Sequence, residues 1–480
     1  MSGGDLRHAD TVRVIVIGAG IAGSAAALAF GRGGHEVVLV DRGAEPSFEG
    51  WSADEVFQRW QPPGIAQFRQ PHNFLGLGRV VLRDRFSDVY GALHRSGAAE
   101  VDQASFLGGT AREPGDTDLA VITCRRPVFD SVLRAAVRRQ PRVTYRPAIV
   151  SGLRVRPNGP ATHVDAAVLA TGEVLPGDLF VDASGRGART AGWLSAAGGP
   201  LLPSVTSECG LLYYSRHYRV REQHPMPRPV SLLGGPRGDL GYLAFAVFLG
   251  DNRTFCLCIM AAPWDKPFRS LREPAAYQRA AALLPGLAPW LEVAEPISPV
   301  LPMGQLRNTL HRVVGATGPL VTGLMPIGDA RCHTNPTFAF GASLSLWHAV
   351  RLADLADRAS DHTDLAMSFD AEIAADATAR FDAVSAEDAD RARLWSGQPM
   401  DVTDAEASMP LFLRFVAYRV AAGDPELLRA VARRIDGLDP VERLPALPHL
   451  LDRARTLYAQ SVATFPEVPP RTTLLAALTG

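Results

Sequence analysis

Lysine is almost absent from this chain, and a surplus of positive charge is absent with it. Lys266 is the only lysine, so nearly all of the 49 basic residues are arginine, and the net charge is −1. This balance excludes a general nucleic-acid binder, because such proteins neutralise phosphates with a surplus of clustered cations. Any mechanism that requires a lysine has one candidate.

Cysteine is scarce and hydrophobic runs are short. The five cysteines form no C-x-x-C pair with zinc spacing, so we expect free buried thiols in a reducing compartment and no metal site. No segment approaches the roughly 20 uninterrupted apolar residues that a membrane-spanning helix requires. We therefore expect a cytoplasmic protein with no transmembrane segment. The sequence does not indicate its oligomeric state.

The strongest motif lies in the segment VRVIVIGAGIAGSAAALAFGRGGHEVVLVDR. Its pattern predicts a buried strand over 12–17, then a glycine turn, a helix and a second strand. Gly18, Gly20 and Gly23 form a G-x-G-x-x-G triplet, which permits a tight turn, approach to a pyrophosphate and close helix packing, in that order. Asp41 ends the second strand about 20 residues later, where a carboxylate can accept ribose hydroxyls. These features predict a dinucleotide without a 2′-phosphate, either FAD or NAD.

Two later segments narrow this choice only when they are taken together with the first. RRPVFDSVLRAAVRR, residues 125–139, predicts a helix with Pro127 in its first turn and Arg126 at its start. LPGDLFVDASGRGARTAGWL, residues 175–194, predicts a short strand that ends at Asp182 before a glycine-arginine turn. Each segment alone is compatible with an ordinary helix or loop.

The fourth segment is GDARCHTNPTFAFGASL, residues 328–344. It places Asp329 and Pro336 before a predicted helix over 341–356. His333 in this loop has two interpretations, a structural or flavin-loop contact on one hand and a catalytic role on the other.

In this order, the four segments resemble those of the glutathione-reductase-type FAD monooxygenases, the family of aromatic-ring hydroxylases and squalene-type epoxidases. The resemblance covers about residues 12–357. It implies that Asp329 hydrogen-bonds the ribityl chain of FAD and that the helix after Pro336 directs its free N–H groups at the pyrophosphate and flavin. The cofactor-binding residues implied are Gly18, Gly20, Ala22, Gly23, Asp41, Arg42, Arg126, Asp182, Gly328, Asp329, Pro336, Gly341, Ala342 and Ser343. The sequence departs from the family pattern at Ala339, where a glycine is usual, and at Ser343, where asparagine is common.

The resemblance also implies an α/β fold, in which a Rossmann-type FAD-binding domain carries an inserted antiparallel-sheet substrate domain and a helical C-terminal region. Residues 1–200 are the expected first part of the FAD-binding domain, and 311–360 its closing motif. Residues 201–310 are the expected substrate-binding sheet, and 361–480 the helical region.

Residues 205–310 contain strand-like runs joined by GDN, a hairpin signal. Aromatic residues on such strands belong either to the core or to a pocket. If they face inward, they suggest an apolar or aromatic substrate. The candidate substrate-binding residues are Tyr214, Phe245, Phe248 and Trp264.

The function that the resemblance implies is an NAD(P)H-consuming FAD monooxygenase of secondary metabolism. Such an enzyme hydroxylates or epoxidises a small apolar or aromatic molecule with dioxygen, through a flavin C4a-hydroperoxide. A reductase of the geranylgeranyl-reductase type is an alternative. A halogenase-like enzyme is disfavoured, because the W-x-W-x-I-P segment and early lysine of flavin halogenases are missing. A scaffold protein with a lapsed flavin site would lack the glycine or aspartate positions, and these are present. No catalytic residue is assigned.

Overall fold

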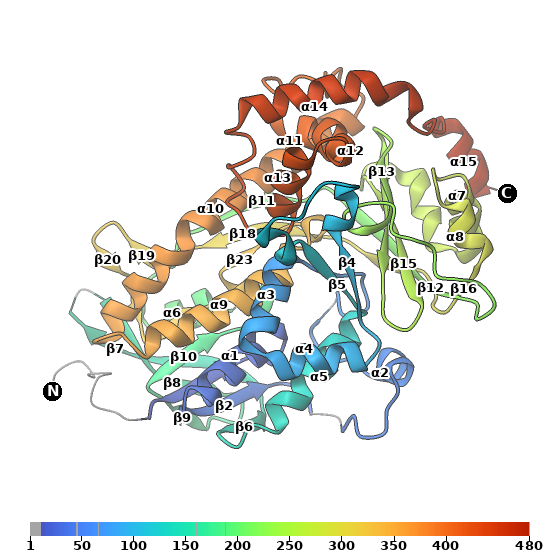
Figure 1. Ribbon diagram of the computed structural model, residues 1–480. Coiled ribbons are helices and arrows are strands. Elements are labelled where there is room, and N and C mark those ends of the chain that lie inside the picture. The colour runs from blue at the N-terminus through green and yellow to red at the C-terminus, as the bar shows by residue number, and fades with distance from the viewer. Residues whose placement is uncertain (1–10, 45–46, 66, 160, 188, 480) are drawn as a thin grey trace.

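A five-stranded parallel sheet lies at the centre of the half of the molecule that contains the N-terminal strand β1 (Figure 1). The computed structural model describes residues 11–44, 47–65, 67–159, 161–187 and 189–479. The strand order is β22-β10-β1-β2-β6, and every neighbouring pair is parallel. The strands are β1 (Arg13–Ile17), β2 (Glu36–Asp41), β6 (Val143–Pro147), β10 (Leu179–Asp182) and β22 (Leu324–Pro326).

Both faces of this sheet are covered, so β1 is buried on both sides as its continuous apolar sequence predicts. Val14 and Val16 pack with the helices of one face, whereas Ile15 and Ile17 pack with an antiparallel sheet on the other. The helices of the first face are α1 (Ile21–Arg32), α3 (Gly76–Arg85), α4 (Ser87–Arg95), α5 (Arg126–Arg138) and α9 (Phe340–Ala356). The antiparallel cover consists of β7 (Val150–Asn158), β8 (Ala161–Leu169) and β9 (Val174–Pro176), with α6 (Thr190–Ala196) beside it.

A second large sheet lies away from the first and has the strand order β13-β14-β15-β12-β16. The expected hairpin is confirmed, because β14 and β15 pair antiparallel around the GDN turn. The strands are β12 (Leu212–Val220), β13 (Gly234–Asp239), β14 (Leu243–Leu249), β15 (Thr254–Ala261), β16 (Ala294–Pro296) and β17 (Leu301–Met303), the last paired with β12. Helices α7 (Pro274–Ala282) and α8 (Ala288–Glu292) cover one face.

Two smaller sheets lie outside these two large ones. A small sheet of β3 (Asn73–Phe74), β5 (Ala120–Thr123) and β4 (Ala99–Asp102) lies between them. Another joins β11 (Ser204–Glu208), β18 (Arg307–His311) and β23 (Cys332–His333). The short elements are α2 (Ala53–Arg59), β19 (Val314–Gly315), β20 (Gly318–Pro319) and β21 (Val321–Thr322).

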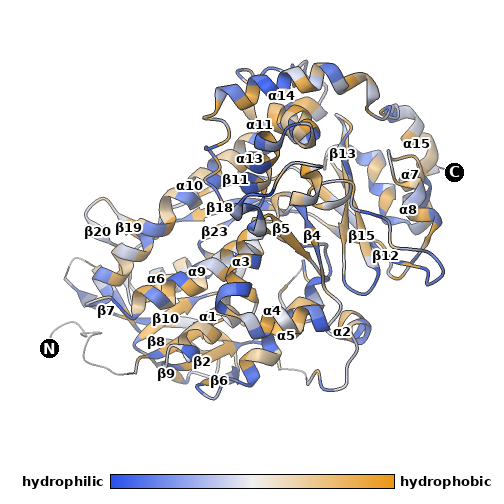
Figure 2. Ribbon diagram, viewed as in Figure 1, coloured by the Kyte–Doolittle hydropathy of each residue, from blue (hydrophilic) through white to orange (hydrophobic). Residues whose placement is uncertain are grey.

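The C-terminal region is helical, as expected, and arches over both sheets (Figure 1). Its elements are α10 (His362–Trp395), α11 (Met409–Phe412), the π-helical turn η8 (Leu413–Ala417), α12 (Tyr418–Val420), α13 (Pro425–Ile435), α14 (Pro448–Ser461) and α15 (Arg471–Thr479). Figure 2 shows hydrophilic and hydrophobic residues mixed along α14, which buries only Leu450, Leu451 and Ala454. Within the described ranges, every helix is too short or too polar to cross a membrane.

The architecture confirms the expected fold class, whereas the domain boundaries stay predictions. The strands of the second large sheet lie between residues 212 and 303, inside the segment 201–310 that is expected to bind substrate. All five cysteines are buried and free, as expected.

A buried carboxylate joins the C-terminal region to helix α3 beside the parallel sheet. Asp436 follows α13 and is fully buried. Its backbone carbonyl accepts a hydrogen bond from the N–H of Leu77 in α3 at 3.0 Å, and its Oδ1 accepts one from Nε2 of Gln103 at 3.2 Å. Burial raises the pKa of Asp436 to about 8, and the nearby backbone of Gly76 opposes this only in part. The protonated form is therefore favoured in the folded state.

Asp436 should make the folded state less stable as the pH rises. Between the unfolded pKa near 4 and the folded pKa of about 8, the folded state binds a proton that the unfolded state lacks. The free energy of unfolding should fall across this window by up to about 1.4 kcal/mol per pH unit, and Asp436→Asn should remove that contribution. Urea unfolding at pH 5 and pH 8 measures the difference.

Asp452→Asn is the matched control, since the Asp452 side chain is 72% exposed. Equal pH dependence of the wild type and the Asp436 variant would contradict the prediction.

Candidate functional site

The glycine turn after β1 brings the start of α1 against the end of the strand. Gly18 has a φ of +100°, and a Cβ there would lie 2.6 Å from the carbonyl oxygen of Ala183. A Cβ on Gly23 would lie 1.7 Å from the carbonyl oxygen of Gly18, so only glycine fits either position. A Cβ on Gly20 would meet no atom within 4 Å, and this residue borders a cavity. The turn and packing roles of Gly18 and Gly23 follow from these distances, whereas cofactor contact at Gly20 stays a prediction.

Helix α1 begins at this turn without a side-chain cap. Gly20 is the N-cap residue, and no acidic residue lies in the first turn. Ile21 and Ala22, the first residues of the helix, line the cavity beside Gly20. A helix N-terminus with free N–H groups carries partial positive charge and binds phosphate oxygens. This end of the cavity is therefore suited to an anionic ligand.

The carboxylate of Asp41 lies in the cavity wall at the end of β2. The N–H of Ala19 donates to its Oδ2 at 2.8 Å, and the N–H of Gly43 donates to its Oδ1 at 3.0 Å. Because each carboxylate oxygen has two lone pairs, both can still accept a hydroxyl donor. Arg42 lines the cavity next to Asp41.

Asp182, at the end of β10, supports the cavity wall and does not line it. Its side chain is fully buried. It accepts hydrogen bonds from the backbone N–H of Ser184 at 3.0 Å, from the Ser184 hydroxyl at 2.6 Å and from the Thr190 hydroxyl. Ser184 and Arg186 lie in the wall itself. Asp182 thus shapes the cavity wall through this turn, and its role at the cofactor stays a prediction.

The closing segment places Asp329 in the wall of the same cavity. Its Oδ2 lies 3.3 Å from Nδ1 of His333, which also lines the cavity. Burial opposes ionisation of Asp329, but His333, Arg126 and Arg186 together hold the pKa of the carboxyl below its usual range. Asp329 is therefore ionised at neutral pH. A Cβ on Gly341 would lie 3.2 Å from Oδ1 of Asp329, so a side chain there would require the Asp329 carboxylate to shift slightly.

A second helix, α9, also begins at this cavity. Residues Pro336–Phe338 form a 3₁₀ turn, and Ala339 takes a left-handed conformation with a φ of +56° before α9 starts at Phe340. No side chain caps α9, and its first turn holds no acidic residue. Gly341 and Ala342 line the cavity, as does Pro336 of the preceding turn. The N-termini of α1 and α9 thus open into one cavity.

Two residues that were expected at the cofactor turn away from the cavity. The Oγ of Ser343 lies 2.7 Å from the position of a Cβ on Gly78 in α3, and it has no hydrogen-bond partner among the described residues. The N–H of Gly328 donates to Nδ1 of His348 at 3.2 Å. Ser345 lines the cavity in place of Ser343. The structure therefore corrects Ser343 to a residue of the α9–α3 contact.

His72 lines the cavity beside Arg126, although no sequence signal marks it. Burial, and then the charge of Arg126, lower the pKa of His72 to about 3, so the ring is neutral at pH 7. Its Nδ1 lies 2.9 Å from the carbonyl oxygen of Gln70 and must carry the proton, since a carbonyl only accepts. Nε2 then accepts a hydrogen bond from Nη1 of Arg126 at 3.3 Å. A lone histidine in QPHNF forms no recognisable pattern.

The alternation of side chains along each strand determines which residues of the second large sheet, β13-β14-β15-β12-β16, face the cavity. The register aligns Tyr213 with Met260, and Met260 with Ala244, and all three line the cavity. Tyr214 points to the opposite face, where it packs in the core under α7 and α8. Trp264 follows β15, is 47% exposed and does not line the cavity. The expected inward orientation of Tyr214 and Trp264 is therefore corrected.

The other two aromatic candidates do border the cavity, from different faces of the sheet. Phe248 lies on the same face of the sheet as Ala244 and Met260, whereas Phe245 packs with the opposite core and reaches the cavity next to β13. A Cβ on Gly238 of β13 would lie 2.9 Å from the ring of Phe245. Alternation along a strand predicts that Phe245 and Phe248, three residues apart, point to opposite faces of the sheet. It does not predict which of the two faces borders the cavity.

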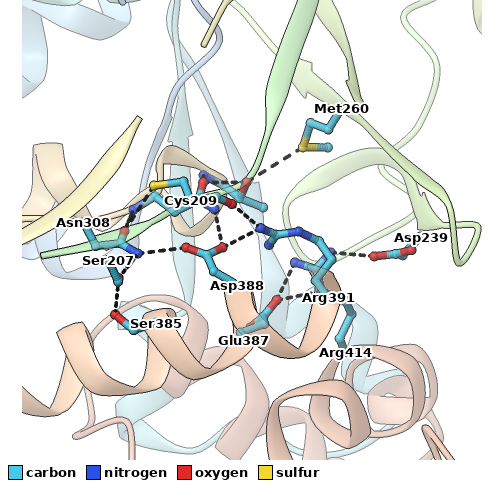
Figure 3. A network of polar contacts seen from close by, with 12 residues as sticks. Ser207, Cys209, Asp239, Met260, Asn308, Ser385, Glu387, Asp388, Arg391 and Arg414 are labelled. Atoms are coloured by element: carbon cyan, nitrogen blue, oxygen red, sulfur yellow. Dashed lines mark hydrogen bonds and ion pairs between the residues drawn. The ribbon is translucent and has the colours of Figure 1, made fainter. Parts of the chain in front are cut away.

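A buried polar network fixes the loop before α9 (Figure 3). In Figure 3, Asp388 of α10 lies between Asn308 of β18 and Arg391, which bond it at 2.8 and 2.7 Å. Asn335 in the loop donates its side-chain Nδ2 to Asp388 at 2.6 Å and its backbone N–H to Oδ1 of Asn308 at 2.6 Å. The Tyr213 hydroxyl bonds the Asn335 side chain in turn. The network therefore joins the loop to the substrate sheet and the C-terminal region.

One continuous cavity of about 1740 Å³ connects all of these residues. It extends from Gly20 and Asp41, past Asp329, to the substrate sheet, and Leu413 and Tyr418 of the C-terminal region also line it. Pockets for one small molecule usually measure roughly 300–1000 Å³. The volume is thus large enough for a dinucleotide together with a second ligand.

Two kinds of reactive group do not occur at this cavity. In the part of the chain that the structure describes, no three or more His, Cys, Asp and Glu side chains are grouped to hold a metal ion. Lys266 is exposed at the start of a 3₁₀ turn and is not a cavity-lining residue.

Comparison with known proteins matches part of the sequence and nearly all of the fold. Residues 13–209 match the family model described as glucose inhibited division protein A, which is less than half of the chain. No curated protein matches the sequence. Among solved structures, the flavin-dependent brominase Bmp2 is similar with a TM-score of 0.60 and 16% identity, covering 94% of this chain and 100% of that one.

Two further solved structures have the same architecture. PqsL of Pseudomonas aeruginosa, a probable FAD-dependent monooxygenase, gives a TM-score of 0.55 at 15% identity, with 81% of this chain and 99% of that chain covered. The 2-methyl-3-hydroxypyridine-5-carboxylic acid oxygenase gives 0.54 at 16% identity, with 88% and 98% covered. These likenesses establish that the chain has the fold of FAD-dependent monooxygenases, as the sequence motifs predict.

Proposed function

We propose that this protein is an FAD-dependent monooxygenase that hydroxylates or epoxidises a small apolar or aromatic molecule and consumes NAD(P)H. One observation carries the proposal: two uncapped helix N-termini, of α1 and α9, open into one cavity that also holds the carboxylates of Asp41 and Asp329. FAD has the matching groups, namely a ribose, a pyrophosphate and a hydroxylated ribityl chain between two ring systems.

The residues along the cavity match the successive groups of FAD, from the ribose through the pyrophosphate and the ribityl chain to the flavin ring. Asp41 would accept the ribose hydroxyls, since both of its oxygens keep a free lone pair. The open space at Gly20 and the first N–H groups of α1 would receive the pyrophosphate. Asp329, ionised between His333 and two arginines, would accept from the ribityl hydroxyls. The first N–H groups of α9 would stabilise negative charge on the flavin ring.

The substrate would lie under the second sheet, beyond the loop before α9. When bound, FAD would take electrons from reduced nicotinamide and activate dioxygen, so the protein needs no nucleophile–base pair of its own. The cavity face of the sheet there presents Ala244, Ala246 and Met260, which exclude water and leave space for an apolar ring. Tyr213 would hold the loop in place through its bond to Asn335.

The alternatives differ in what they require of these residues. A halogenase of the resembling kind uses an active-site lysine, and Lys266 lies outside the cavity. A reductase of the geranylgeranyl-reductase type would use the same FAD residues and the same apolar surface, so the reaction has to separate it from an oxygenase.

The first test is cofactor content. The protein should purify yellow with one FAD per chain. Asp41→Ala and Asp329→Ala each remove a charge-assisted acceptor worth about 1.5 to 3 kcal/mol, so FAD affinity should fall by about tenfold or more while the far-UV circular dichroism is retained. Unchanged FAD titrations in both variants, or wild type without flavin in denatured extracts, would disprove the proposed cofactor site.

A glycine variant tests the position of the pyrophosphate. Gly20→Val should fold, because no protein atom lies within 4 Å of a Cβ there, but the new side chain would occupy the space next to the start of α1. FAD affinity should fall by about tenfold or more. Gly109→Val is the control, since Gly109 is equally open but does not line the cavity. Full FAD binding by the Gly20 variant would place the dinucleotide elsewhere.

The fate of dioxygen during turnover distinguishes an oxygenase from a reductase. Turnover of a panel of aromatic and polyene substrates under isotopically labelled dioxygen should consume reduced nicotinamide and oxygen together, with one labelled atom in the product. Lys266→Ala should turn over like the wild type, because this side chain is exposed outside the cavity. Product formed at full yield without oxygen, or carrying oxygen from solvent alone, would rule out the monooxygenase.

A further inference from the structure

Arg237 lies on the cavity side of the substrate sheet. The register aligns it with Ala246 of β14, and Ala246 with Cys258 of β15, and all three line the cavity. This row is two residues along the strands from the row of Ala244 and Met260, a step of roughly 7 Å. Arg237 is thus within the length of a small aromatic molecule of Ala244 and Met260, which belong to the apolar surface proposed to contact the substrate.

The charge of Arg237 has no carboxylate partner among the residues that the structure describes. Its Nε lies 3.3 Å from the hydroxyl of Ser231. The guanidinium also lies 6.0 Å from the centre of the Phe248 ring, a cation–π distance. Both contacts leave the Nη groups free to donate, and a planar guanidinium with free N–H groups matches the two oxygens of a carboxylate.

Two carboxylates that line this end of the cavity, Glu387 and Asp239, are already engaged by a different arginine. Figure 3 shows Arg414 between Glu387 and Asp239, which it bonds at 2.7 and 3.3 Å. Asp239 accepts a further bond from Nε1 of Trp395 at 2.9 Å. Arg414 is therefore paired with two carboxylates. Arg237 lies two residues before Asp239 on the same strand and is paired with neither.

Arg237 is exposed at the surface of the cavity, so a ligand that enters the cavity can reach its guanidinium. Desolvation in the cavity wall, and then the charge of Arg414, lower the pKa of Arg237 to about 10, so it stays charged at pH 7. The cavity wall includes Leu232, Leu233 and Phe248, which solvate a cation poorly. A charge in such a place is stabilised by an anion of the ligand.

We propose that Arg237 binds an anionic group of the substrate, so that the substrate is an apolar or aromatic acid with its carboxylate held at β13. This inference rests on the proposed function for the identity of the bound molecule as substrate. Whether the cavity binds an acid more tightly than a neutral analogue does not depend on the reaction, and binding measurements without turnover can determine it.

The test is a calorimetric titration of the purified protein with 2-naphthoate and with 2-naphthamide, which differ in charge and share the ring. The wild type should bind the acid about tenfold or more tightly than the amide. Arg237→Leu should lower the affinity for the acid by about the same factor and leave that for the amide unchanged, and Arg237→Lys should restore part of the preference. Circular dichroism establishes that each variant is folded.

Arg272→Leu is the matched control, because Arg272 is 68% exposed and does not line the cavity. Binding of 2-naphthyl phosphate more tightly than 2-naphthoate, lost in the same Arg237 variant, would also support the proposal and would identify phosphate as the anion. A wild type that does not favour the acid, or a folded Arg237→Leu variant that keeps the preference, would overturn it. FAD content is measured separately, so protein without flavin would refute the proposed function and leave the result on Arg237 standing.

Discussion

The contact between the backbones of Gly18 and Gly23 sets the geometry on which the rest of the site depends. It lets α1 start directly at the end of β1, so that the first N–H groups of the helix reach the cavity. The closing segment also packs closely against α1, since a Cβ on Gly328 would lie 3.2 Å from Cβ of Ala22. Helix α9 packs in the same core as α1. Two segments separated by about three hundred residues therefore present their helix starts to one ligand.

The buried network around Asp388 has a different purpose, which is to fix the loop before α9. Asp388 and Arg391 are each about 1% exposed in their side chains, and buried ions of this kind add little net stability, because they lose hydration on folding. They do specify one arrangement, since every donor and acceptor needs its partner. Asn335 is the point at which this specificity reaches the loop. The position of α9 is thus set from both sides, by α1 and by the C-terminal region.

Much of the fold could be predicted from the sequence because its signals are local. The glycine triplet, the apolar run of β1 and the GDN hairpin each depend on neighbouring residues, and the structure contains the strands and turns they predict. The orientation of Tyr213 and Tyr214 could not be predicted, since alternation separates two faces without identifying them. His72 could not be found either, because its role follows from Arg126 and Gln70 across the fold.

Ala339 holds a backbone conformation that usually requires glycine. The left-handed conformation there favours glycine and costs other residues about 1 to 2 kcal/mol, yet Ala339 adopts it with a φ of +56°. The 3₁₀ turn before it and the bonds of Asn335 hold the chain in place. The substitution was correctly identified in the sequence, but its tolerance depends on tertiary contacts that the sequence does not display.

The two ends of the cavity are built by different stretches of the chain. The end near Asp41 comes from the parallel sheet and its turns, whereas Leu413, Tyr418 and β13 form the other end. Amino-acid changes in the C-terminal helices can therefore accumulate during evolution without disturbing the glycine turn. Such a division would let the shape of the far end change while the start of α1 keeps its place at the other end.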